Sequence, residues 1–130
     1  MLHPQQFEIN EAWIVFRLNN KAIPTEQDGD LNCIALMDAA SCFILASELI
    51  LATSDEPTDI QFRRLLKNAK SHKQQLPKTL FIAREDAAEM AARVATDLDI
   101  EVVRVPGNEL LVFIGEARQA FAERFEVGSP

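Results

Sequence analysis

Two apolar segments separated by a short polar turn constrain the fold of this chain more than any other feature. The first covers residues 31–37 and the second covers residues 42–52, with Asp38-Ala39-Ala40-Ser41 between them. Two β-prone segments joined by such a turn predict an antiparallel hairpin. Because both arms are almost continuously apolar, we expect this hairpin to lie inside a sheet that is covered on both faces.

Another strand is predicted ahead of the hairpin, over residues 12–18. Side chains alternate between the two faces of a strand, so Trp13, Val15 and Arg17 share one face. The residues before this strand are mostly polar and include Pro4. We therefore expect residues 1–11 to be a flexible leader.

Helices and strands alternate after the hairpin. A helix of about 15 residues is predicted to start after Thr58 or Asp59, because apolar residues then recur with a helical period. The apolar stripe of this helix consists of Phe62, Leu65, Leu66 and Ala69. A short strand follows over residues 79–83. Asp86 then resembles a capping residue for a second helix, since its carboxylate could accept hydrogen bonds from free backbone N–H groups.

A last strand is predicted over residues 101–105, with a final helix that holds Ala117, Ala120 and Phe121 against the core. Residues 109–114 allow two interpretations. They could pair with the last strand as a hairpin, or they could form the first turns of the final helix. The sequence favours an irregular entry followed by helix, although Gly115 costs a helix roughly 1 kcal/mol relative to alanine.

This order of elements predicts an α/β domain built on a mixed five-stranded sheet. Three antiparallel strands come first, alternating helices and strands follow, and helices cover both faces. We expect a single domain over residues 12–126, between the leader and a short tail at residues 127–130.

Charge and cysteine content narrow the classes of function. Asp and Glu number 20 against 13 Lys and Arg, which gives a formal net charge of −7 and disfavours general attraction to nucleic acid. The only cysteines, Cys33 and Cys42, are too few for a disulfide scaffold, and we expect reduced thiols. Without a secretion signal or a long apolar run, a cytoplasmic protein is expected and a membrane partner is not.

The predicted order resembles the ribonuclease H-like fold, above all the cores of integrases and transposases. Trp13 near the first strand, the hairpin over 31–52, the helix near 59–73 and the segment 81–86 (Phe-Ile-Ala-Arg-Glu-Asp) carry the resemblance. Residues 36–49 and Leu76-Pro77-Lys78 also resemble an uncharacterised bacterial domain family of this fold. The resemblance spans roughly residues 12–125 and concerns topological order, not a catalytic signature.

The resemblance also implies a site that this chain does not complete. Metal-dependent enzymes of this fold hold two divalent ions with three acidic residues, and the first of these lies midway along the first strand. Arg17 is found there. The second acid could be Glu85 or Asp86, and the third could be Glu109 or Glu116. The resemblance therefore implies a non-catalytic domain that acts as a protein-interaction or scaffold module, without a metal or another cofactor.

Two alternatives remain open at this point. In a shifted register, Asp38, Asp86 and Glu116 could converge as the site of a degenerate metal-dependent nuclease. Their simpler roles are a turn residue for Asp38, a helix cap for Asp86 and a solvated helix residue for Glu116.

The other alternative is nucleic acid binding through a basic helix face. Its candidate binding residues are Arg63, Arg64, Lys67, Lys70 and Lys73. Such a cluster is also typical of an ordinary solvated face. The expected partner is therefore an unknown protein or a second copy of the chain, with nucleic acid as the less favoured choice.

Overall fold

A computed structural model describes residues 2–126 of the chain, and the expected tail at 127–130 lies outside these residues. Five strands form one mixed sheet in the order β3-β2-β1-β4-β5. The strands are β1 (Ala12–Arg17), β2 (Leu31–Asp38), β3 (Ile44–Leu51), β4 (Thr79–Ala83) and β5 (Glu101–Val105). β1, β2 and β3 pair antiparallel, while β4 pairs parallel with both β1 and β5. The predicted mixed five-stranded sheet is thereby confirmed.

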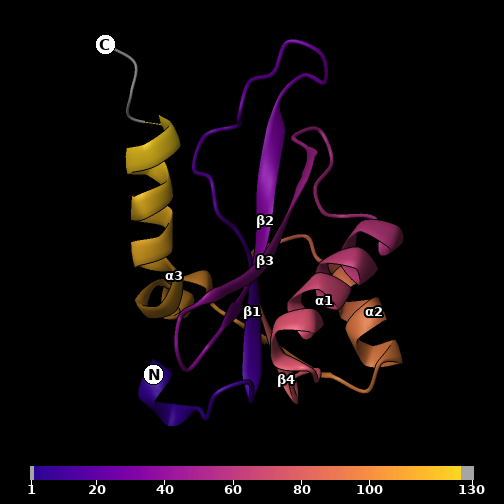
Figure 1. Ribbon diagram of the computed structural model, residues 1–130, viewed down its shortest axis with the longest axis vertical. Helices are drawn as coiled ribbons and strands as arrows, with labels where there is room; N and C mark the ends of the chain where they lie inside the picture. Colours follow the sequence, from indigo (N-terminus) through magenta and orange to yellow (C-terminus); the bar gives the residue numbers. More distant parts are fainter. Residues whose placement is uncertain (1, 127–130) are drawn as a thin grey trace.

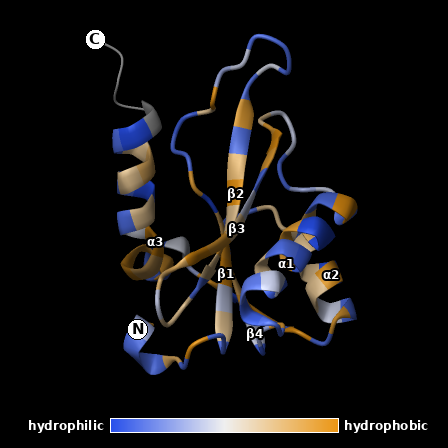
Figure 2. Ribbon diagram, in the orientation of Figure 1, coloured by the Kyte–Doolittle hydropathy of each residue, from blue (hydrophilic) through white to orange (hydrophobic). Residues whose placement is uncertain are grey.

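Helices cover both faces of the sheet, as predicted (Figure 1). α1 (Asp59–Lys73) and α2 (Glu89–Asp97) contribute to one core cluster, and α3 (Gly107–Phe121) contributes to the other. A short π-helical segment, Ala122–Glu126, continues α3. The first turns of α3 are strongly hydrophobic, whereas its later turns mix hydrophobic and hydrophilic residues (Figure 2).

β1 divides the core between the two faces of the sheet. Trp13 and Val15 lie in the cluster with α1 and α2, while Ile14 and Phe16 lie in the cluster with α3. The indole of Trp13 is fully buried. This alternation is the one predicted from residues 12–18, and β1, like β2 and β4, contributes side chains to both cores.

α1 follows its local sequence closely. Thr58 caps the helix: its hydroxyl accepts from the backbone N–H of Gln61, and the Gln61 side chain accepts from the N–H of Thr58. The predicted apolar stripe is buried against the sheet. The helix ends at Gln74, which adopts a left-handed conformation with φ of 65°.

The hairpin forms, but its position in the sheet differs from the prediction. β3 is an edge strand, and its Leu49 and Leu51 side chains are 54% and 49% exposed. The turn is also longer than expected: Cys42 has a positive φ of 60° and β3 starts only at Ile44. An apolar run indicates strand formation, but it does not reveal which strand lacks a neighbour on its far side.

The segment before β1, expected to be a flexible leader, packs on the sheet. A short 3₁₀-helix, Pro4–Gln6, is capped by His3. The ring of Phe7 then contacts the rings of Phe81 and Phe113, with centroids 5.6 and 6.1 Å apart. The mostly polar composition of this segment did not indicate the anchor, because only a few of its residues, Leu2 and Phe7 among them, pack against the core.

α3 starts directly at Gly107, so neither the irregular entry nor the strand alternative over residues 109–114 occurs. The Glu85 carboxylate accepts from the backbone N–H of Gly107 at 2.8 Å. A Cβ at this position would lie 3.3 Å from the same carboxylate. Glycine thus allows a side chain from another loop to approach the helix start closely, which the local sequence does not reveal.

Asp38 is the polar centre of the end of the sheet where β1 begins. It is fully buried, and its Oδ1 accepts from the backbone N–H of Asn10 at 2.7 Å. Its Oδ2 accepts from the backbone N–H and the hydroxyl of Ser41, at 2.9 and 2.7 Å. Asn10 in turn accepts from the indole N–H of Trp13 at 2.7 Å. One carboxylate therefore joins the N-terminal segment to the β2–β3 turn.

We predict that Asp38→Ala destabilises the domain by about 3 kcal/mol, because three donors lose their buried acceptor. Urea denaturation monitored by circular dichroism measures the loss. Asp28→Ala, in the exposed 24–30 loop, is the matched control and should cost less than about 0.5 kcal/mol. Equal stabilities of the two variants would contradict the role assigned to Asp38.

Candidate functional site

A cleft of about 250 Å³ opens at the carboxyl ends of β1 and β4. These strands are neighbours and run parallel, whereas β2 on the other side of β1 runs antiparallel. Crevices beyond the carboxyl ends of strands, where the direction of chain connection changes, are the usual ligand sites of open α/β sheets. The position and volume of this cleft therefore make it the candidate functional site.

The floor of the cleft is apolar and comes from four neighbouring strands. Val15 of β1, Ile34 of β2, Ile50 of β3 and Ile82 of β4 line it. All four are buried side chains of the cluster that packs under α1 and α2. The floor is therefore continuous with the core and rigid, which suits a preformed site.

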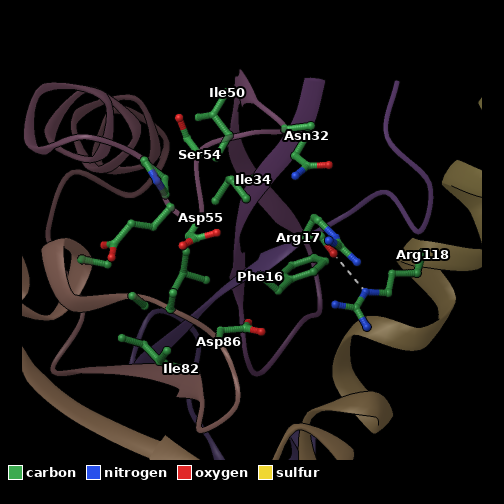
Figure 3. A pocket seen from close by; sticks show the side chains of 17 residues that line it. Phe16, Arg17, Asn32, Ile34, Ile50, Ser54, Asp55, Ile82, Asp86 and Arg118 are labelled. Atoms are coloured by element: carbon green, nitrogen blue, oxygen red, sulfur yellow. Dashed lines mark hydrogen bonds between the residues drawn. The ribbon is translucent and has the colours of Figure 1, made fainter. Parts of the chain in front are cut away.

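Two arginines stand on one side of the cleft (Figure 3). Arg17 is the last residue of β1, and Arg118 reaches toward it from α3. The Arg118 Nε donates to the carbonyl oxygen of Arg17 at 3.0 Å, and its guanidinium lies 5.9 Å from the centre of the Phe16 ring. The backbone bond and the aromatic face together fix the plane of this guanidinium.

The electrostatic surroundings of Arg118 are unfavourable for its charge. Burial lowers the pKa of Arg118, the negative charge of Asp86 opposes that effect, and the positive charge of Arg17 adds to it. Arginine still stays protonated at neutral pH. Two like charges thus face the cleft close together. Within residues 2–124, no ion pair under 4 Å is formed by either one.

The opposite side of the cleft carries Asp55, Glu56 and Asp86. The Glu56 carboxylate accepts from the backbone N–H groups of Glu89 and Met90, at 3.1 and 2.6 Å. A carboxylate at a helix N-terminus satisfies free donors and interacts favourably with the helix dipole. Glu56 therefore caps α2 from a distant loop, and the prediction that Asp86 provides this cap is wrong.

The structure does not bring the three carboxylates of the shifted-register alternative together. Asp38 pairs with Trp13 near the start of β1, whereas Asp86 follows the end of β4, at the opposite end of the sheet. Glu116 is exposed on α3, and its charge, like that of Asp38, raises the pKa of Cys42 after the larger effect of burial. Through residue 124, no group of three or more His, Cys, Asp or Glu side chains could hold a metal ion.

The basic face predicted on α1 is largely neutralised at its start. The Nε of Arg63 lies 2.7 Å from the Asp59 carboxylate, and the Nε of Arg64 donates to the Glu48 carboxylate at 3.1 Å. These hydrogen bonds raise the pKa of each arginine. Of the remaining predicted residues, Lys67 and Lys70 are exposed and Lys73 is half-buried.

Sequence reasoning missed Asp55, Glu56 and Arg118, and it noted Arg17 only as a departure from an acidic site. Arg118 lies four positions after the buried Ile114, so it continues the inward stripe of α3. A charged residue on an apolar helix stripe was the signal that could have identified Arg118. Glu56 had no comparable signal, because its partners are 33 and 34 positions away.

The sheet order and the placement of the helices match the ribonuclease H-like fold that integrase and transposase catalytic cores also have. Within that class, the chain belongs to the family described as "Domain of unknown function (DUF6930)", which matches residues 4–122. No curated protein matches the chain by sequence.

Three solved structures share this fold at low sequence identity. A chain of the simian T-cell lymphotropic virus intasome, solved with PP2A regulatory subunit B56 gamma, is 13% identical with a TM-score of 0.59; the match covers 88% of our chain and only 39% of that chain. The HTLV-2 integrase catalytic core domain with magnesium is 11% identical, with a TM-score of 0.52 over 87% of this chain and 84% of that one. The catalytic domain of Mos1 mariner transposase is 12% identical, with a TM-score of 0.50; the match covers 92% of this chain and 72% of that one.

At such identities the similarity establishes the fold alone. The intasome chain is also much longer than the part matched here. Over the residues that the structure describes, no helix has the length and apolar character needed to cross a membrane.

We predict that Glu56→Ala lowers the stability of the domain by about 1 kcal/mol, because two backbone N–H groups in the first turn of α2 lose their acceptor and Ala88 provides no cap of its own. Thermal and urea denaturation measure the change. Hydrogen exchange at Glu89 and Met90 should accelerate in the variant. Glu26→Ala, in an exposed loop, is the control and should leave both measurements unchanged. Unaltered exchange at the two amides in Glu56→Ala would refute the capping role.

Proposed function

We propose that this chain is a non-catalytic domain of ribonuclease H-like fold that binds a protein partner at the cleft between β1, β4 and α2. The observation that supports the proposal is the pair of guanidinium groups, Arg17 and Arg118, at the carboxyl end of β1. The resemblance to metal-dependent enzymes of this fold implies a metal-holding carboxylate on that strand.

Charge favours a binding site over a metal site at this position. Divalent ions such as Mg²⁺ are held by carboxylate oxygens, and two neighbouring guanidinium groups repel them. Glu56 is already engaged by the N–H groups of α2, which leaves Asp55 and Asp86 as the remaining carboxylates of the cleft. Two-metal chemistry needs more negative charge than this arrangement offers.

The same arrangement suits recognition. An apolar floor with a few polar groups at the rim is typical of sites that bind a ligand or a segment of another protein. Arginine is also common in the centre of protein interfaces, because its planar donors form several hydrogen bonds at once. The cleft therefore favours an interaction module, whose partner is another protein or a second copy of this chain.

We predict that Mg²⁺ and Mn²⁺ support no cleavage of single-stranded or duplex DNA or RNA by the purified protein. Neither ion should raise the melting temperature, because binding to the folded state alone would raise it. Asp86→Ala is the matched variant, and it should behave like the unmodified chain in both assays. Metal-dependent cleavage that Asp86→Ala abolishes would overturn the non-catalytic proposal.

Nucleic acid binding through α1 is a second candidate, favoured by the exposure of Lys67 and Lys70. Against it stand the engaged Arg63 and Arg64 and the net charge of −7. We predict unchanged gel mobility of DNA and RNA at low salt. A mobility shift that weakens steeply with added salt and on Lys67→Glu, but not on Lys21→Glu, would instead support this second candidate.

A further inference from the structure

We propose that the cleft recognises the free carboxylate of an apolar C-terminal residue, held between Arg17 and Arg118 with its side chain on the isoleucine floor. This inference rests on the proposed function and names the chemistry of the partner. It is carried by how Arg118 is presented, by the charges around the cleft, and by the volume available.

The guanidinium of Arg118 is set up to bind an anion. Its Nε is engaged by the carbonyl of Arg17, and one face of its plane lies over the Phe16 ring. Arg118 lines the cleft, and its two terminal amino groups form no hydrogen bond or ion pair within residues 2–124. Guanidinium groups bind carboxylates through parallel N–H donors, and a fixed plane reduces the entropy lost on binding.

The second guanidinium makes an anion more favourable still. Arg17 is exposed at the rim, and its side chain forms no hydrogen bond or ion pair within residues 2–124. Its charge lies close enough to lower the pKa of Arg118. An anion between the two groups would replace this repulsion with two attractions.

The charges on the other side of the cleft limit the size of that anion. Asp55 and Asp86 line the cleft a short distance away, and the whole chain carries a net charge of −7. A phosphodiester chain would place successive negative charges beside these carboxylates. A single carboxylate avoids them, and the aspartates can accept N–H groups of the peptide that bears it.

The apolar floor and the volume of the cleft favour an apolar side chain next to the bound carboxylate. Ile34 and Ile50 each expose a small apolar area beside the arginines, Ile82 lies fully buried beneath it, and the volume of the cleft is about 250 Å³. That space suits one branched side chain with its terminal carboxylate. A C-terminal residue joins these two groups at one carbon atom, whereas an acidic side chain carries no apolar branch.

Chemical-shift titration of the ¹⁵N-labelled full chain tests this inference directly. The probe is N-acetyl-Gly-Leu with a free carboxylate, compared with its C-terminal amide and with inorganic phosphate. We expect saturable shifts at amides around the cleft, from Val15 to Arg17 and from Ala87 to Ala91. The amide probe should bind at least about ten-fold more weakly, since charge-assisted hydrogen bonds are lost.

The variants Arg17→Gln and Arg118→Gln should each weaken binding of the free acid by about ten-fold. Arg93→Gln, an exposed arginine of α2 that does not line the cleft, is the matched control and should bind normally. If Arg118→Gln does not fold, as its ¹⁵N spectrum would reveal, Arg17→Gln alone decides the outcome.

Equal affinity for the acid and the amide, or full affinity in Arg17→Gln, would overturn the inference. Phosphate that shifts the same amides as tightly as the peptide would overturn the assignment to a carboxylate. These outcomes are distinguishable from failure of the proposed function, because that failure appears as metal-dependent cleavage and needs no peptide.

Discussion

The fold depends on a buried carboxylate that is satisfied without a cation. Asp38 is fully enclosed and accepts from Asn10 and Ser41, while Asn10 holds the indole of Trp13. Burying a charge is costly unless every lone pair is used. The contacts that meet this cost fix the position of the N-terminal segment, the start of β1 and the β2–β3 turn together. Because β1 supplies side chains to both cores, loss of the Asp38 hydrogen bonds would disturb the packing on both faces of the sheet.

Much of the fold could be predicted from the sequence, because many elements are set by neighbours along the chain. The Thr58 cap and the apolar stripe of α1 involve residues within one or a few turns, and the strand at 79–83 is a short apolar run. The remaining elements depend on contacts across the chain. Glu56 caps α2, Glu85 meets the start of α3, and Phe7 anchors the first residues. No local pattern encodes such partners.

In the candidate site, too, the features that depend on long-range contacts could not be predicted from the sequence. Arg17 was singled out because the resemblance places it where related enzymes hold a carboxylate, but it was not predicted as a binding residue. Arg118 was not singled out, since its approach to Arg17 joins residues 101 positions apart. The acids of the shifted-register alternative illustrate the opposite error: Asp38 ends β2 and Asp86 follows β4, so β1 separates the two strands and the two residues lie at opposite ends of the sheet. Three acidic residues suggested a metal site, but the register of the strands keeps Asp38 and Asp86 apart.

The bond between Glu56 and α2 links the shape of the cleft to the integrity of a helix. The carboxylate that forms part of the cleft wall is the same group that closes the first turn of α2. Outward movement of the 52–58 loop therefore leaves helix donors unsatisfied, and fraying of the helix releases the loop. Widening of the mouth and fraying of the first turn of α2 are thus thermodynamically coupled, by about 1 kcal/mol, which is what such a cap contributes.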